Sequence, residues 1–287
     1  MREPTFILKG GAAAYESGSL DRISVPKGEV SILNKDKIYI STTASDAAEV
    51  ARRWGLGIEI AEYCTAWNMD DEFAETDVLV RKKLEGISRR VLHAPFNELF
   101  PCAIDRKARL LASERYRQAI ELAKHYGAEK VIIHGGYNGR MYYPEWYIEQ
   151  SILFWKQFLK EDPGVEIVLE NVLEEDPAWL LDVIRSVGNP RLRLCLDVGH
   201  VNAYSKVPVM QWLDTCGSDI SHFHIHNNDG SWDTHSSLNQ GNIPIKELLQ
   251  KAEILCPEAT VTLELMEAEE SVNWLRGSNL MRWESTG

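Results

Sequence analysis

Residues 222–243, with the sequence HFHIHNNDGSWDTHSSLNQGNI, contain four of the eight histidines of the chain. Acidic and amide side chains stand between these histidines, so imidazole and oxygen ligands are concentrated in one short segment. Neutral imidazole and carboxylate groups bind divalent metals, and imidazole also exchanges protons near neutral pH. The segment therefore indicates either a metal site or an acid–base site.

Two glutamates elsewhere in the chain point to the same chemistry. Glu170 lies in VEIVLENV and Glu264 lies in VTLELM, and both segments are otherwise mostly apolar. An ionised carboxylate in such a segment is costly to bury unless a positive charge lies near it. Lys and Arg are scarce around both positions, so a bound metal ion is the simplest source of that charge.

The types of ligand narrow the choice of metal only in part. Carboxylates and imidazoles without a thiolate favour Mn²⁺, Zn²⁺, Co²⁺, Fe²⁺ or Mg²⁺ over a structural zinc site. The five cysteines are odd in number and form no C-x-x-C pair, which indicates neither a disulfide framework nor a thiolate zinc site. We expect reduced thiols, as in a cytoplasmic protein.

The elements that must position these residues follow a regular alternation. Short runs rich in Val, Ile and Leu alternate with longer segments of helical periodicity, as in repeated βα units around a parallel sheet. The predicted strands are residues 37–42, 55–63, 89–96, 129–136, 165–171, 191–200, 220–229 and 260–266. Predicted helices include residues 45–55, which open with a capping Ser or Asp, and residues 109–128, 144–161 and 176–189.

Eight strands with intervening helices favour a closed barrel over an open doubly wound sheet. No G-x-G-x-x-G motif follows the first predicted strand, which also argues against the open sheet. The sequence therefore predicts an α/β fold, a (β/α)8 TIM barrel formed by residues 37–287. Residues 1–36 fit no βα unit and are predicted to be an N-terminal extension of this single domain.

Active sites of such barrels lie at the carboxyl ends of the strands. Six consecutive predicted strands carry a titratable or metal-binding group at that end or in the loop that follows. In chain order, these groups are His93, His134, Glu170, Asp197 with His200, His224 and His226 with Asp233 and His235, and Glu264.

The alternation of side chains along a strand places His222, His224 and His226 on one face of the seventh strand. His226 is closest to the open end and is the predicted ligand, whereas His222 and His224 are predicted to fill barrel layers or to support the site. A single histidine at a strand end is more often structural than a ligand. His93 and His134 are therefore weaker candidates than the two glutamates.

Composition argues against several classes of partner. The chain of 287 residues has a formal net charge of −12 and a pI of about 5.2, which disfavours binding to the phosphate backbone of a nucleic acid. No segment resembles a signal peptide, and none approaches the about 18 consecutive apolar residues of a membrane span. We expect a cytoplasmic protein with a small-molecule substrate and no membrane partner.

Seven motifs follow one another between residues 37 and 266, namely HAPF, IIHGG, LEN, LDVGH, HNND, DTHSSLNQGNI and LEL. Their succession at consecutive strand ends resembles the xylose isomerase-like superfamily, which joins sugar and sugar-phosphate isomerases and epimerases to the endonuclease IV group. Each motif alone is weak, but their common order is specific.

The isomerase and epimerase branch of that superfamily implies one divalent metal ion, held by residues that match Glu170, Asp197, His226 and Glu264. The resemblance implies that Glu170 and Glu264 lie on opposite faces of a bound sugar or sugar phosphate. They would transfer a proton through a metal-stabilised enediolate while His200 contacts a substrate oxygen. The protein is thus expected to be a metal-dependent sugar isomerase or epimerase.

Three aromatic residues in predicted loops at the same face are expected to stack on the sugar. These are Trp67, Tyr137 and Trp232. The outer helices of such barrels often pair, so a homo-oligomer is a further expectation.

The endonuclease IV branch implies a different centre, a cluster of three zinc ions that cleaves abasic DNA. The additional positions match His93, His134, His200, Asp233 and His235. Against this alternative, the first strand reads KIYISTTAS, and the loop NELFPCAIDRK lacks the tyrosine and the segment that the nuclease inserts into the duplex. We prefer the isomerase or epimerase, and a non-catalytic metal-binding or sugar-binding relative is the third hypothesis.

Overall fold

The computed structural model describes residues 33–282. Most of the predicted N-terminal extension, residues 1–36, lies outside the described residues. Its last residues form β1 (Leu33–Asn34), which pairs in parallel with β10 (Met281–Arg282), and the start of the short 3-10 helix η1 (Lys35–Lys37). The boundary of the barrel domain after residue 36 stays a prediction.

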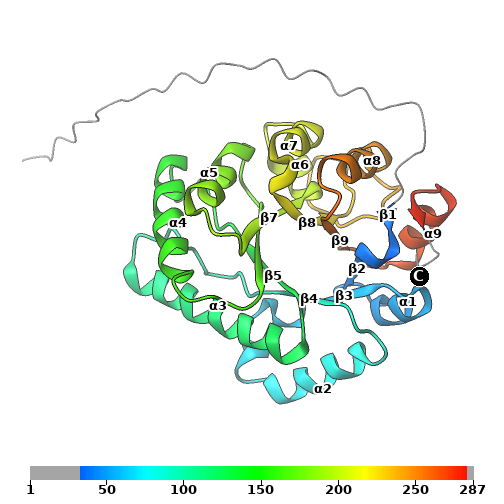
Figure 1. The fold of residues 1–287 in the computed structure, drawn as a ribbon, viewed down its shortest axis with the longest axis horizontal. Helices are drawn as coiled ribbons and strands as arrows, with labels where there is room; N and C mark the ends of the chain where they lie inside the picture. Colours follow the sequence, from blue (N-terminus) through cyan, green and yellow to red (C-terminus); the bar gives the residue numbers. More distant parts are fainter. Residues whose placement is uncertain (1–32, 283–287) are drawn as a thin grey trace, which may run out of the picture. The chain divides into compact units, whose positions relative to one another are not determined.

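Eight parallel strands close into a barrel in chain order, as Figure 1 shows. The first strand pairs with the last, with Tyr39 opposite Thr262, so the sheet has no free edge. The eight strands are β2 (Ile38–Ser41), β3 (Gly57–Ile60), β4 (Arg90–His93), β5 (Lys130–His134), β6 (Glu166–Glu170), β7 (Leu192–Asp197), β8 (Ile220–Ile225) and β9 (Thr260–Leu263). Each lies within a predicted strand, and the predicted (β/α)8 barrel is confirmed.

Helices surround this barrel (Figure 1). They are α1 (Ala47–Trp54), α2 (Phe73–Leu84), α3 (Arg106–Tyr126), α4 (Pro144–Phe158), α5 (Pro177–Val187), α6 (Val198–Tyr204), α7 (Val209–Cys216), α8 (Ile245–Leu255) and α9 (Glu269–Gly277). Short 3-10 helices occur at η2 (Glu62–Cys64), η3 (Trp67–Met69) and η4 (Gly217–Asp219). The four helices predicted from the sequence are α1, α3, α4 and α5.

Asp46 precedes α1 as predicted, but its side chain does not cap that helix. Its carboxylate accepts hydrogen bonds from the backbone N–H groups of Ala268 (2.8 Å) and Glu269 (2.9 Å) at the start of α9. A carboxylate is favourable at either helix N-terminus, because both expose unsatisfied N–H groups. Asp46 thus joins the first helix of the barrel to the last.

The barrel interior is filled by side chains that point inward from successive strands. One interior cluster consists of Tyr39, Val91, Ile132, Val168 and Cys195, all buried. Gly57 leaves room for the ring of Tyr39, because a Cβ atom at this position would lie 2.3 Å from the ring. Packed side chains therefore fill this part of the barrel interior, and the polar groups described below lie next to them.

The five cysteines are free thiols, as expected. In the part of the chain from residue 33 to residue 282, no helix combines the length and the apolar character that a bilayer crossing requires.

Candidate metal and acid–base site

Glu170 lies at the centre of a group of histidines at the carboxyl ends of the strands. Its side chain is 1% exposed. Its oxygens lie 3.2 Å from His93 Nε2, 3.5 Å from His134 Nε2, 3.3 Å from His200 Nδ1 and 3.3 Å from His224 Nδ1. Four imidazoles from β4, β5, α6 and β8 thus converge on one buried carboxylate.

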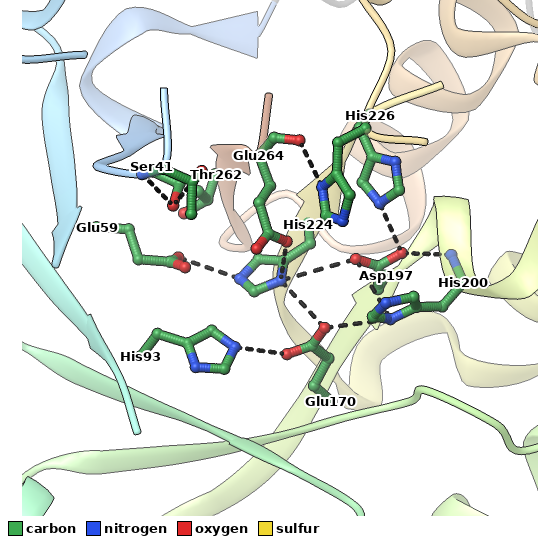
Figure 2. Close-up of polar contacts among 12 residues, drawn as sticks. Ser41, Glu59, His93, Glu170, Asp197, His200, His224, His226, Thr262 and Glu264 are labelled. Carbon is green, nitrogen blue, oxygen red and sulfur yellow. Dashed lines mark hydrogen bonds and ion pairs between the residues drawn. The ribbon is translucent and has the colours of Figure 1, made fainter. Parts of the chain in front are cut away.

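Three carboxylates meet at a single nitrogen, Nδ1 of His224. This atom lies 3.1 Å from Glu264 Oε2, 3.3 Å from Glu170 Oε1 and 3.8 Å from Asp197 Oδ2. One ligand atom from each of these four residues lies within 4.8 Å of the others. Figure 2 shows His224 facing the three carboxylates, and we call these four residues the central group.

The central group differs from the predicted one in its histidine, because His224 takes the place assigned to His226. In the strand register, His224 lies opposite Asp197 of β7 and Thr262 of β9, at the level of the carboxylates. His226 follows the end of β8, and its Nε2 lies 3.3 Å from Asp197 Oδ1 and 3.5 Å from Asp233 Oδ1. The two histidines point to the same face, but they belong to different levels of the barrel.

His226 belongs to a second group with Asp233 and His235, whose ligand atoms also lie within 4.8 Å of one another. Asp233 Oδ2 is 3.0 Å from His235 Nε2 and 3.2 Å from His200 Nε2. The loop after β8 is held in place by an isolated bridge between Asn227 and Ser236. We call His200, His226, Asp233 and His235 the loop group.

A third group lies on the other side of Glu170 and contains His93 and His134, with ligand atoms within 4.8 Å. The ring of His134 stacks on Phe96 at 4.3 Å. Burial lowers the pKa of His134 to about 4, so this imidazole is neutral at neutral pH and can bind a metal. The predicted additional ligands thus lie in two groups that adjoin the central group.

The charges of the site balance one another without Lys or Arg. Burial alone would raise the pKa of Asp197, but His200 and His226 beside it keep that pKa below its ordinary value. Burial acts to lower the pKa of His235, whereas the hydrogen bond to Asp233 raises it to about 9. In the metal-free protein, imidazolium groups therefore compensate the carboxylates.

Several buried ligand atoms lack a hydrogen bond, and this observation tests whether a metal fits. Among the described residues, Asp197 Oδ2, His224 Nδ1, both ring nitrogens of His226, and Asp233 Oδ1 are buried without a hydrogen-bond partner. Such orphaned polar atoms are rare unless another group satisfies them. A divalent ion satisfies nitrogen and oxygen ligands of this kind, so the residues present fit a bound metal.

Comparison with known proteins places the chain in a family. Residues 49–278 match the model of the xylose isomerase-like TIM barrel family. The chain belongs to this family. It is 30% identical over 193 residues to the uncharacterized protein MJ1311 of Methanocaldococcus jannaschii, covering 63% of this chain and 66% of that protein. It is 24% identical over 161 residues to fructoselysine 3-epimerase of Shigella flexneri, covering 51% of this chain and 55% of the epimerase.

These matches span less than two thirds of the length of either relative. Among solved structures, the TTHB071 protein of Thermus thermophilus, from crystals soaked with ZnCl₂, superposes with a TM-score of 0.68 at 24% identity. The superposition covers 84% of this chain and 97% of that one. This likeness supports the fold of the xylose isomerase-like family.

The three aromatic residues predicted to stack on a sugar have different surroundings in this xylose isomerase-like barrel. Trp67 and Trp232 are 71% and 65% exposed. Trp232 meets Tyr204 edge to face at 6.1 Å, and the ring of Tyr204 stacks on His200 at 6.2 Å. Tyr137 is buried against Tyr147 and Trp179, so its ring has little free surface for a ligand.

The sequence analysis missed a buried acidic residue next to His224, Glu59 of β3. Its side chain is fully buried, and Oε2 lies 3.1 Å from His224 Nε2. Glu59 stands in the largely apolar segment GLGIEIAEY. The desolvation argument that identified Glu170 and Glu264 applies equally to this position, and it would have found Glu59.

Proposed function

We propose that the protein is a divalent-metal-dependent isomerase or epimerase of sugars or sugar phosphates. The observation that carries this proposal is the central group, in which Glu170 of β6 and Glu264 after β9 both contact His224 Nδ1. Two carboxylates that approach one position can remove a proton from a substrate carbon and return it. The similarity to a fructoselysine 3-epimerase supports this class of reaction.

The residues that fit the ion are Glu170, Asp197, His224 and Glu264. A divalent ion held there would supply Lewis acidity, which would acidify the C–H group next to the carbonyl group of a hydroxy-ketone. Zn²⁺, Mn²⁺, Co²⁺ and Mg²⁺ are the candidates by ligand type.

The two glutamates differ in their access to solvent. The side chain of Glu264 is 13% exposed, whereas that of Glu170 is 1% exposed. Burial would raise the pKa of Glu264, but the adjacent His224 keeps it below its ordinary value, so this carboxylate is ionised and can accept a proton. Glu170 is surrounded by four imidazoles, and we assign it to the opposite face of the substrate.

His200 is more constrained than the resemblance implies. Its Nδ1 lies 2.9 Å from the backbone oxygen of Asn171, and its Nε2 lies 3.2 Å from Asp233 Oδ2. To contact a substrate oxygen, His200 Nε2 must therefore give up its contact with Asp233. A small sugar that enters beside Asp233 can take over this contact.

Deuterium exchange tests the proposed reaction. With Mn²⁺ in D₂O, the protein should incorporate deuterium next to the carbonyl group of a ketose from a panel of free and phosphorylated sugars. Glu264→Gln at saturating Mn²⁺ should lower the exchange rate by about 10²-fold or more, because the proton acceptor is lost. Glu247→Gln, on the exposed side of α8, is the control and should exchange as the parent does.

Two outcomes contradict the proposal. One is exchange at the parental rate in Glu264→Gln, since the carboxylate would then not carry the proton. The other is a complete lack of exchange with every ketose of the panel.

The adjoining ligand groups favour one second candidate, a metal-cluster phosphodiesterase of the endonuclease IV type. His93 and His134 on one side, and the loop group on the other, supply ligands for further ions. Elemental analysis separates the candidates, because the isomerase or epimerase needs one ion per chain and the nuclease needs three zinc ions. Three zinc ions together with cleavage of an abasic duplex would replace our first proposal.

A further inference from the structure

Glu59 lies on the opposite side of His224 from the three carboxylates of the central group, as Figure 2 shows. Its side chain has no exposed surface. Glu59 Oε2 lies 3.1 Å from Nε2 of His224, while Nδ1 of the same ring faces Glu264 and Glu170 at 3.1 and 3.3 Å. One imidazole therefore connects a carboxylate inside the barrel to the carboxylates at its mouth.

His224 is the closest partner of Glu59. Two further imidazoles lie near Glu59: Nε2 of His222 is 3.5 Å from Glu59 Oε2, and a ring nitrogen of His93 is within 4.8 Å of a carboxylate oxygen of Glu59. Both ring nitrogens of His222 have nearer partners, the hydroxyl groups of Thr260 at 2.6 Å and Thr262 at 2.9 Å. In residues 33–281, the second oxygen of Glu59, Oε1, is buried without a hydrogen bond, so the contact with His224 is the principal one.

This contact fixes the tautomer of His224. An ionised carboxylate only accepts hydrogen bonds, so the proton of a neutral His224 ring must lie on Nε2, where it is donated to Glu59. The lone pair of the ring then lies on Nδ1, which points at three carboxylates. A lone pair among anionic oxygens is repelled unless a cation stands between them.

We propose that Glu59 is a positioning residue that holds the Nε2–H of His224 and thereby presents Nδ1 to a divalent ion in the central group. This inference rests on the proposed metal site. Histidine ligands of metals commonly donate their second N–H to a carboxylate, and removal of that partner weakens metal binding by about 10- to 100-fold. Here β3 supplies the partner from within the barrel, where the side chain of Glu59 is fully buried.

The test is a titration of the full-length protein with Co²⁺, followed by visible absorption and without any sugar. Glu59→Gln removes the negative charge and keeps the shape of the side chain. It should raise the dissociation constant for Co²⁺ about 10- to 100-fold and change the absorption spectrum of the bound ion. The control is Glu166→Gln, since Glu166 of β6 contacts Ser221 and Lys130 instead of a central-group residue. This control should leave both readouts unchanged.

A second measurement observes the parent protein and needs no substitution of Glu59. Nitrogen NMR of the Zn²⁺-loaded parent with ¹⁵N-labelled histidine reports which ring nitrogen carries the proton. The resonances of His224, assigned by their loss in His224→Gln, should show a proton on Nε2 and a metal bond at Nδ1.

The outcomes separate this inference from the proposed function. Unchanged Co²⁺ affinity in Glu59→Gln, or a metal bond at Nε2 of His224, overturns the role of Glu59 and leaves the metal site intact. Loss of one bound ion per chain in Glu59→Gln also overturns it, because Glu59 would then be a ligand itself.

If the parent binds no Co²⁺ at all, the metal site fails, and the role of Glu59 fails with it. Metal binding without deuterium exchange in any sugar refutes the isomerase or epimerase alone.

Discussion

At the scale of single residues, the site works by balancing buried charges with imidazole rather than with Lys or Arg. Burial acts to lower the pKa of His224, but the carboxylates around it, those of Glu59, Glu170 and Glu264, raise it well above the ordinary imidazole value. Without a metal, the protonated ring of His224 supplies the positive charge that a bound ion would otherwise provide.

This arrangement predicts that metal binding releases a proton. The metal-free protein holds the proton of His224 more tightly than a free imidazole does, so an incoming ion must displace it. The apparent affinity for Mn²⁺ should therefore increase with pH across the neutral range, because this range lies below the raised pKa of His224. Calorimetric titration in buffers of different ionisation enthalpy should show about one proton released per ion.

The control for this prediction is His125→Gln, because His125 lies on α3 next to Asp77, outside the three ligand groups. It should leave the proton count unchanged. An affinity that does not vary between pH 6 and pH 8, or a heat that is the same in every buffer, contradicts the prediction.

The sequence identifies some residues of the site but not others. Glu170 and Glu264 are identifiable because a carboxylate within an apolar run needs a positive partner, and the structure gives each of them imidazole partners. The choice between His224 and His226 is not identifiable in this way. Alternation fixes the face of a strand, whereas the level at which a side chain meets its neighbours depends on the stagger of the closed barrel.

At the scale of elements, α6 shows how the end of a strand becomes part of the site. Asp197 ends β7, and its carboxylate accepts a hydrogen bond from the backbone N–H of His200 at 2.6 Å, which caps α6. Gly199, in the first turn of this helix, lies against the ring of His226, and a Cβ atom there would lie 1.9 Å from the ring. The motif LDVGH therefore packs α6 against the segment that follows β8.

Gly199→Ala should accordingly displace His226 and destabilise the protein. Such overpacking of a buried contact typically lowers the free energy of unfolding by about 1–3 kcal/mol, and urea unfolding of the metal-free protein measures it. Gly277→Ala in α9 is the matched control, because its new methyl group meets nothing within 4 Å. A Gly199→Ala protein as stable as the control would show that the ring of His226 is not held against this helix.

The strands were predictable at this scale because eight apolar runs alternate with helical segments. The helix α6 was not predictable from the sequence, because it has only seven residues and follows β7 without a loop. A helix so short carries too little periodicity to be distinguished from the end of the strand. The prediction that the Asp46 side chain caps α1 was also wrong, because its partner in α9 is distant in sequence.

At the scale of the whole molecule, barrel closure gathers residues that are far apart in the chain. The strand ends that carry His93 and Glu264 enclose the same position as those that carry Glu170 and Asp197, although these residues span most of the described chain. A formal net charge of −12 also attracts divalent cations to the protein. The closed barrel and the acidic net charge thus both favour the binding of a divalent cation.

The central claim is that Glu170, Asp197, His224 and Glu264 bind one divalent ion. The most direct test is a crystal structure of the protein with Mn²⁺, in which anomalous scattering locates the ion. We predict an ion among the four side chains, about 2.0–2.3 Å from Nδ1 of His224 and from the carboxylate oxygens. An ion bound through His226 instead of His224, or no ion between these carboxylates at saturating Mn²⁺, would contradict the account.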